Sequence, residues 1–115
     1  MKKILIIDDE PDLLDSLAEF FADEGYGVAT ARNGTEALER LEDPELPAIV
    51  ILDLLMPGIS GIELYDTMQR DPRLCKVPVI VSTSDPSRAP SGVLIMKKPV
   101  NLGRLLDVVR QHVPT

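Results

Sequence analysis

Two hydrophobic periodicities alternate along the chain. Continuous apolar runs are typical of strands covered on both faces of a sheet, and they predict strands at 3–7, 26–30, 48–52, 77–82 and 93–96. Between these runs the apolar residues recur at helical spacing, which predicts helices starting at Pro11 and covering 33–42, 60–70 and 101–113. The alternation predicts the α/β class, with a five-stranded parallel sheet and helices on both faces.

Local signals support the helix boundaries. Pro11 suits a first helical turn, and Gly25 suits the position after the last turn of the same helix. Ser60 and Asn101 are expected N-caps, because their side chains can accept hydrogen bonds from the first free backbone N–H groups. We found no linker, low-complexity tract or long internal repeat, so residues 1–115 are expected to form one domain.

Charge and cysteine content narrow the class of protein. The chain has 19 carboxylates against 12 Lys and Arg, a net charge of −7, which argues against nucleic acid or an anionic membrane as partner. Cys75 is the single cysteine, so no internal disulfide can form, and a reducing compartment is expected. No apolar run is long enough to span a bilayer, which together with the cysteine predicts a soluble cytoplasmic protein.

Polar residues follow four of the five predicted strands. They are Asp8 and Asp9, then Asp53, then the run 82–84 with Thr83 at its centre, and finally Lys97 and Lys98. Because the carboxyl ends of parallel strands meet at one edge of a sheet, we expect these groups to lie together. Hard carboxylate oxygens suit Mg²⁺, which neutralises them and keeps positions open for water and phosphate oxygens. We therefore expect Mg²⁺ at this edge.

A simpler interpretation exists for the first pair of acids. Asp8 and Asp9 alone fit a solvated strand end, or acids stabilised by the dipole of the helix that begins at Pro11. Adjacent carboxylates nevertheless repel one another unless a positive group lies among them. Asp53, at the end of the most hydrophobic strand, makes a bound cation the better explanation.

Five stretches resemble one known family, the receiver domain of bacterial two-component response regulators. They are "ILIIDDEP" (4–11), "ARNGTEAL" (31–38), "ILDLLMPGISG" (51–61), "VPVIVSTS" (77–84) and "KKP" (97–99). The stretch "DLLMPGISG" matches the family pattern D-[LIVM]-x-M-P-x-x-x-G and is the most specific of the five. The resemblance covers essentially the whole chain and suggests the single-domain type of receiver, with a flavodoxin-like fold.

The resemblance implies a role for each acid. Asp53 resembles the phosphoacceptor, a carboxylate nucleophile that takes the phosphoryl group of a partner's phosphohistidine. Asp9 and Asp53 are similar to direct Mg²⁺ ligands, Asp8 to a ligand that acts partly through water, and the backbone carbonyl of Leu55 to the last protein ligand. Phosphoryl transfer needs an in-line nucleophile and positive charge on the equatorial oxygens, which agrees with these assignments.

Two further residues resemble the family's response elements. Thr83 is similar to the hydroxyl that moves to bond the new phosphoryl oxygen, and Lys98 to the lysine that pairs with the acceptor and then with its phosphoryl group. The implied partners are a sensor histidine kinase or phosphotransfer protein and a downstream protein effector. The resemblance implies assisted phosphorylation and dephosphorylation of the chain's own aspartate, not enzymatic turnover of an external substrate, in a monomer or weak dimer.

The chain departs from the family before its last strand. From Thr83 to Lys98 is 15 positions, which must hold a helix, a strand and both loops. Pro86 could begin a helix, but Pro90 would break it within a turn, so the fourth helix is expected to be lost or reduced to a turn. Ile95 stands where the family usually has Tyr or Phe, three residues before the lysine. In the family the fourth helix, fifth strand and fifth helix form the usual output and dimerisation face. We therefore expect the coupling between phosphorylation and output to be altered in this chain.

Two other classes of function remain open on the sequence. One is a pseudo-receiver, in which the same fold serves as a constitutive protein-interaction module. The retained set of acids, hydroxyl and lysine speaks against it, since an idle site has no need to tolerate the repulsion. The other is a Mg²⁺-dependent phosphatase of the haloacid dehalogenase type, but that family places its aspartates as D-x-D, whereas Asp8 and Asp9 are adjacent here.

Overall fold

The structure is a computed structural model that describes residues 3–114. Its strands are β1 (Lys3–Ile7), β2 (Gly27–Ala31), β3 (Ile49–Asp53), β4 (Val79–Thr83) and β5 (Leu94–Lys97). Its helices are α1 (Pro11–Asp23), α2 (Gly34–Leu41), α3 (Gly61–Arg70) and α4 (Leu102–His112), with a short 3₁₀ turn, η1 (Pro86–Arg88). Each expected strand and helix is present, with bounds that differ from the predictions by at most two residues.

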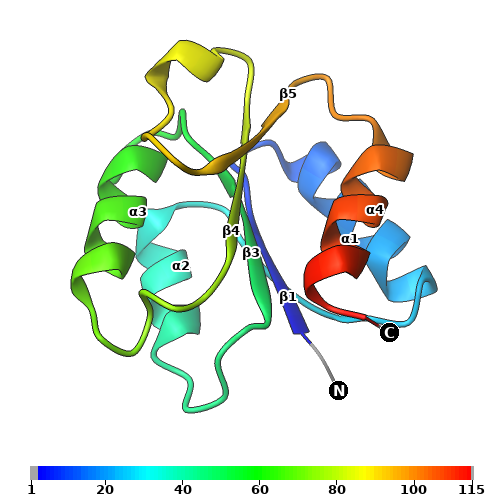
Figure 1. Ribbon diagram of the computed structural model, residues 1–115, viewed down its shortest axis with the longest axis horizontal. Helices are drawn as coiled ribbons and strands as arrows, with labels where there is room; N and C mark the ends of the chain where they lie inside the picture. The colour runs from blue at the N-terminus through cyan, green and yellow to red at the C-terminus, as the bar shows by residue number, and fades with distance from the viewer. Residues whose placement is uncertain (1–2, 115) are drawn as a thin grey trace.

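All five strands are parallel and lie in the order β2-β1-β3-β4-β5. Helices α2 and α3 cover one face of the sheet, and α1 and α4 cover the other (Figure 1). The α/β class with a five-stranded parallel sheet is therefore confirmed. No helix within residues 3–114 has the length and apolar character needed to cross a bilayer.

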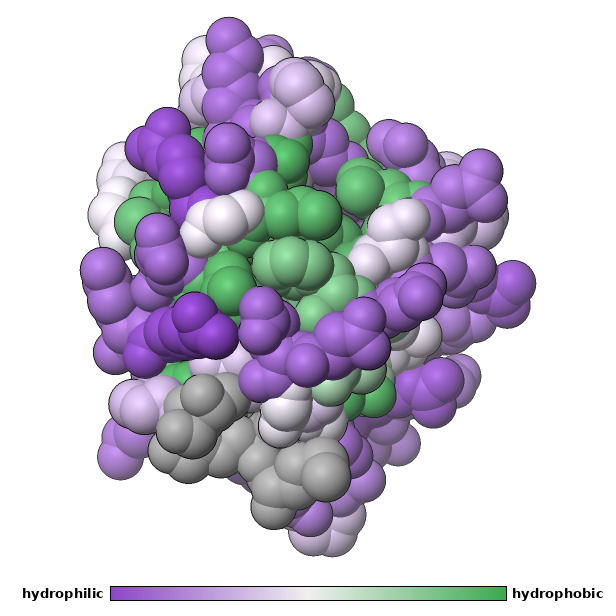
Figure 2. All heavy atoms as spheres, turned by 90° about the vertical axis from the view of Figure 1, so that its right-hand side faces the viewer, coloured by the Kyte–Doolittle hydropathy of each residue, from purple (hydrophilic) through white to green (hydrophobic). Residues whose placement is uncertain are grey.

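Alternate residues of the central strands supply two separate cores. Ile4, Ile6 and their neighbours pack with α1 and α4, whereas Leu5, Ile7 and theirs pack with α2 and α3. Every residue of β3 is buried, because this strand is paired on both sides and covered on both faces. Figure 2 shows the α1 and α4 side, where apolar side chains form a central area surrounded by polar ones.

The predicted helix ends are confirmed at the caps. Ser60 forms a capping box with Glu63, in which each side chain accepts a hydrogen bond from the other residue's backbone N–H. Asn101 accepts from the backbone N–H of Arg104 at the start of α4. Gly25 follows α1 with a φ of 95°, a backbone conformation that residues with a Cβ rarely adopt.

The segment between β4 and β5 holds no full helix. Residues 84–93 contain only η1, whose first turn is fixed by the Asp85 side chain accepting from the backbone N–H of Ser87. Pro90 lies just beyond this turn and cannot extend a helix. The predicted reduction of the fourth helix is confirmed, and the crossover is completed by an irregular chain.

Candidate functional site

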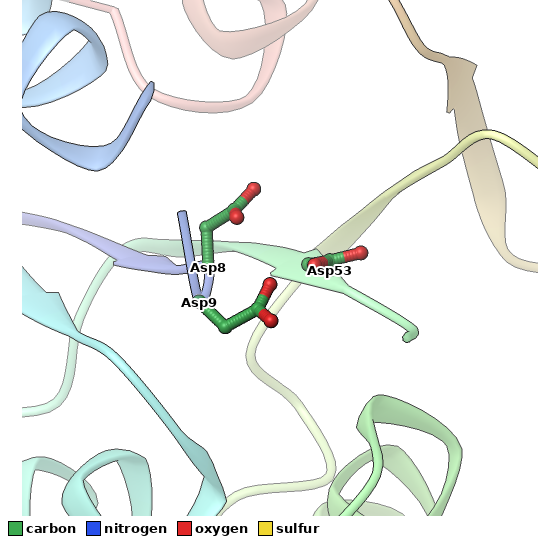
Figure 3. Close-up of side chains that lie close together, drawn as sticks. All are labelled: Asp8, Asp9 and Asp53. Atoms are coloured by element: carbon green, nitrogen blue, oxygen red, sulfur yellow. The ribbon is translucent and has the colours of Figure 1, made fainter. Parts of the chain in front are cut away.

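Three carboxylates converge at the carboxyl ends of β1 and β3. Asp8 and Asp9 follow the last residue of β1, and Asp53 is the last residue of β3. One oxygen from each lies within 4.8 Å of one from each of the others. Figure 3 shows the three side chains projecting from neighbouring strand ends toward the same side. The structure therefore brings the three acids together as the sequence predicts.

The backbone around Asp53 is held tightly. The backbone N–H of Leu55 donates to Asp53 Oδ1 at 3.3 Å, and the N–H of Gly61 donates to the carbonyl of Leu54 at 2.9 Å. A Cβ at Gly61 would lie 2.2 Å from the carbonyl oxygen of Asp53, so only glycine allows α3 to start against this chain. This close approach explains why the motif ends in glycine.

Lys98 places its ammonium among the acids. Its Nζ lies 3.0 Å from Asp8 Oδ2, 3.6 Å from Asp53 Oδ2 and 3.7 Å from Glu10 Oε1. The Lys98 side chain is only 15% exposed, and those of Asp8 and Asp53 are 4% and 5% exposed. The sequence expectation paired Lys98 with Asp53; the structure places it within ion-pair distance of Asp53 but closer to Asp8.

These charges set the protonation of the acceptor candidate. Burial of the Asp53 carboxylate, followed by the negative charge of Asp8, raises the pKa of Asp53 to about 6, and Lys98 and the Leu55 N–H only partly oppose this. Burial alone would lower the pKa of Lys98, but the hydrogen bond to Asp8 and the charges of the carboxylates raise it. The ammonium is thus kept charged where negative charge accumulates.

Thr83 ends β4 beside this cluster. The residue is 1% exposed, and its Oγ1 accepts a hydrogen bond from the backbone N–H of Asp85 at 3.1 Å. Its carbonyl accepts from the backbone N–H of Lys98 at 2.8 Å, which ties the end of β4 to the residue after β5. The hydroxyl therefore holds the first residues of the segment that replaces the fourth helix.

An open cleft of about 690 Å³ gives access to the cluster. It is lined by Asp9, Glu10, Leu13, Asp53, Leu55, Ser84, Lys98, Pro99 and Val100. Leu55, one of its apolar lining residues, is 41% exposed. A phosphoryl group carried by another molecule could reach the Asp53 carboxylate through this opening.

The donor set fits a magnesium ion. Hard carboxylate oxygens from three residues, open to solvent on one side, are ligands that Mg²⁺ prefers while it keeps several waters. Asp8 is oriented by the backbone N–H of Glu10, which donates to its Oδ1 at 3.0 Å. The role of the Leu55 carbonyl as a further ligand stays a prediction.

Glu10 is the one charged contact that sequence reasoning left without a role. Its carboxylate is the third acid near Lys98, although it is exposed. The signal was present in the sequence, since Glu10 completes the acidic run that follows β1. Lys97, the neighbouring lysine, is exposed and does not line the cleft, so of the two lysines expected at this edge only Lys98 joins the cluster.

Comparison with known sequences points to one family. A family model described as the response regulator receiver domain matches residues 4–110. The chain is 30% identical, over 118 aligned positions, to sporulation initiation phosphotransferase F of Bacillus subtilis, with 98% of this chain and 94% of that protein covered. It is 38% identical over 84 residues to a CpxR homolog of Haemophilus influenzae, where it spans 35% of the regulator's length.

Solved structures give the same grouping. The response regulator TrrA of Thermotoga maritima, solved in complex with Mg²⁺-BeF, superimposes with a TM-score of 0.86 at 31% identity, covering 98% of this chain and 100% of TrrA. A complex of TrrA with the histidine kinase ThkA gives a TM-score of 0.84 at 32% identity, covering 98% of this chain and 99% of that chain. CheY4 of Vibrio cholerae, at 24% identity, covers 98% of this chain and 99% of its own with a TM-score of 0.85, which supports the fold.

Proposed function

Because the chain belongs to the response regulator receiver domain family, we propose that it is a phosphorylation-controlled signalling switch whose acceptor is Asp53. The observation that carries this proposal is the convergence of Asp8, Asp9 and Asp53 with the ammonium of Lys98 in one accessible cleft. Asp8 and Asp53 are buried, and buried acids this close together are unfavourable for the fold, so the cluster calls for a positively charged ligand.

The proposed reaction is transfer of a phosphoryl group from a phosphohistidine to Asp53. A carboxylate oxygen of Asp53 forms the new bond to phosphorus while the bond from phosphorus to the histidine nitrogen breaks, and the nitrogen retains the electron pair. The protein's contribution is position and positive charge, since the transition state carries charge on three equatorial oxygens. Lys98 lies 3.6 Å from Asp53 and would follow the phosphoryl oxygens with little movement.

Bound at Asp8, Asp9, Asp53 and the Leu55 carbonyl, Mg²⁺ would supply further positive charge to the transferred group. This part of the proposal is supported by the donor set and by TrrA, a similar protein solved with Mg²⁺-BeF. In its absence Lys98 is the only cation that the structure places among the three acids within residues 3–114. Its ammonium alone leaves an excess of negative charge.

The proposed response begins at Thr83. Its hydroxyl oxygen accepts from the Asp85 N–H at 3.1 Å, and its proton is donated to the Asp85 carbonyl at 3.5 Å; a new phosphoryl oxygen on Asp53 would compete with that carbonyl for the proton. Movement of Thr83 would release Asp85 and hence the η1 turn that Asp85 caps. Phosphorylation would then be signalled by a rearrangement of residues 84–92. The Tyr or Phe that usually takes part in the family is absent, because Ile95 occupies its position.

The proposed partners follow from the family and from the similar proteins. A sensor histidine kinase or phosphotransfer protein would supply the phosphoryl group, as suggested by the kinase complex of TrrA. The output would be a protein effector or onward transfer, as the name of the Bacillus phosphotransferase suggests. We expect no turnover of an external substrate, a cytoplasmic location, and a monomer or weak dimer.

The acceptor assignment is tested by intact mass spectrometry. The protein is incubated with acetyl phosphate in the presence of Mg²⁺, in parallel with Asp53→Asn and with Asp12→Asn, an exposed acid of α1 outside the cluster. We expect one phosphoryl group on the wild type and on Asp12→Asn, and none on Asp53→Asn or after metal chelation. Added mass that survives Asp53→Asn would contradict the assignment.

A constitutive interaction module is the second candidate. The observation in its favour is the reduction of the fourth helix to η1, which leaves Ile95 37% exposed on a surface that the usual relay would need. A partner isolated with this chain distinguishes the two functions. Equal affinity for the phosphorylated and unphosphorylated forms would favour the constitutive module, whereas a clear preference would favour the switch.

A further inference from the structure

The sheet has an open edge at β5. This strand ends the order β2-β1-β3-β4-β5, it pairs with no strand but β4 within residues 3–114, and three of its four residues are exposed. β5 lies at the front of the sheet in Figure 1, and no other element covers its outer side in that view. The opposite edge is better protected, because Arg40 donates from Nε to the carbonyl of Thr30 in β2. Exposed strand edges are templates for a further strand.

Backbone alternation identifies the groups that face outward. The N–H of Lys98 donates to the carbonyl of Thr83 in β4. Since successive residues of a strand point their backbone groups to opposite sides, Leu94 and Met96 face β4 like Lys98, and Ile95 and Lys97 face away from it. The N–H and C=O groups of Ile95 and Lys97 are therefore available to a further strand.

The charge around this edge is opposite to that of the whole chain. Residues 86–106 contain four cations and no Asp or Glu, although the chain has a net charge of −7. Lys98 belongs to the acceptor site, but Arg88, Lys97 and Arg104 are exposed and have no carboxylate within ion-pair distance among the described residues. A ligand for this edge is expected to be acidic.

Apolar surface lies beside these cations. Ile95, Lys97 and Arg104 line one shallow pocket of about 290 Å³, together with Met96, Pro99 and Asn101. Ile95 pairs with the fully buried Val81 of β4, yet it is 37% exposed itself. We refer to Ile95, Lys97 and Arg104, with the outward backbone groups of β5, as the β5 edge surface.

We propose that the β5 edge surface binds an acidic, extended segment of a partner protein, which adds to the sheet as a sixth strand beside β5. Backbone hydrogen bonds to Ile95 and Lys97 would supply affinity, and carboxylates near Lys97 and Arg104 would supply specificity. The inference goes beyond the phosphoacceptor role and does not depend on it, because every group involved is exposed in the unphosphorylated chain.

A second copy of the same chain is a poor occupant of this edge. A twofold interface would place the β5 edge surface of one molecule against that of the other, and would bring Lys97 and Arg104 near their own counterparts. Like charges at a shared edge oppose pairing, and a lysine on an edge strand is a common protection against self-association. An acidic partner gains from the same charges.

The test uses the whole, unphosphorylated chain, labelled for nuclear magnetic resonance. Two capped peptides of strand length are added, one alternating valine with glutamate and the other valine with lysine. We expect the glutamate peptide to bind and to slow amide exchange at Ile95 and Lys97, while exchange at Leu94 and Met96, already paired with β4, changes little. A glutamate peptide N-methylated along its binding edge is expected to lose the protection, since it lacks the backbone donors.

Charge reversal provides the matched comparison. Lys97→Glu should weaken binding of the glutamate peptide by about tenfold, and Arg70→Glu, at an exposed position at the end of α3 away from β5, by less than about twofold. Equal binding of the two peptides, unchanged exchange at Ile95 and Lys97, or no binding at about 1 mM would overturn the proposal. Equally tight binding of oligothymidine would also overturn it, because the surface would then bind polyanions in general. A chain that cannot be phosphorylated at Asp53 should give the same results in each of these binding measurements, so the two proposals can fail separately.

Discussion

Asp53 is charged in an environment that disfavours its charge. Burial and the neighbouring Asp8 raise the pKa of Asp53 to about 6, well above the value of a free aspartate. The same features that destabilise the metal-free carboxylate suit it to a ligand that brings positive charge. Lys98 reduces the repulsion without removing it, because one ammonium lies among Asp8, Glu10 and Asp53.

This pKa predicts how stability depends on pH. A carboxyl group whose folded pKa is raised stabilises the fold below its unfolded pKa, and that contribution is lost as the pH rises through about 6. In metal-free buffer at about pH 8, Asp53→Asn should therefore increase the free energy of unfolding by roughly 1–2 kcal/mol. The gain should shrink below about pH 5. Denaturant unfolding at both pH values measures it, and a destabilised variant at the higher pH would contradict the electrostatic account.

At the scale of elements, the contact between β3 and α3 fixes the acceptor. Gly61 begins α3 directly against the backbone of Asp53 and Leu54, and Ser60 caps the same helix. The helix start thus determines where the chain leaves β3. A change at this contact should disturb both packing and acceptor geometry.

Gly61→Ala tests this contact. A Cβ would lie 2.2 Å from the Asp53 carbonyl oxygen, so the backbone must shift. We expect this shift to lower the free energy of unfolding by about 1–3 kcal/mol. Gly103→Ala in α4 is the matched control, because its Cβ would meet nothing closer than 3.4 Å, and alanine there should stabilise by about 0.5–1 kcal/mol. Thermal unfolding of both variants measures the difference. Similar shifts in the two would show that the close approach is unimportant.

Element type could be predicted from the sequence more readily than element boundaries. The runs at 3–7 and 48–52 are apolar throughout because both faces of the central strands are covered, and this pattern is visible in the sequence. Boundaries depend on pairing instead. Tyr26 was predicted as a strand residue, but β2 begins at Gly27, and the Tyr26 hydroxyl donates to the carbonyl of Val113 in a contact between distant parts of the chain.

The candidate site, too, could be predicted from the sequence only in part. Asp8, Asp9, Asp53, Thr83 and Lys98 could be predicted because each lies at or just after the carboxyl end of a strand, and parallel strands bring these ends together. The distances within the cluster could not, because they depend on strand stagger and side-chain rotamers. For this reason the shorter contact of Lys98 with Asp8 than with Asp53 was not foreseen.

At the scale of the whole molecule, charge is distributed unevenly. The chain as a whole has a net negative charge, but residues 86–106, which include η1 and β5, contain four Lys and Arg and no Asp or Glu. Thr83 connects the acceptor cluster to this region through its bonds with Asp85 and Lys98. The proposed acceptor site and the proposed docking edge are thus joined by a short stretch of hydrogen-bonded backbone.

The convergence of three acids on a divalent cation is tested most directly by magnesium titration of the unphosphorylated protein. Unfolding free energy is measured as Mg²⁺ is added to wild type, Asp9→Asn, Asp53→Asn and the surface control Asp107→Asn. We predict saturable stabilisation of wild type and control, reaching about 2.7 kcal/mol at a hundredfold excess over the dissociation constant, and little in the two site variants. Stabilisation that is absent, or equal in all four proteins, would contradict the account.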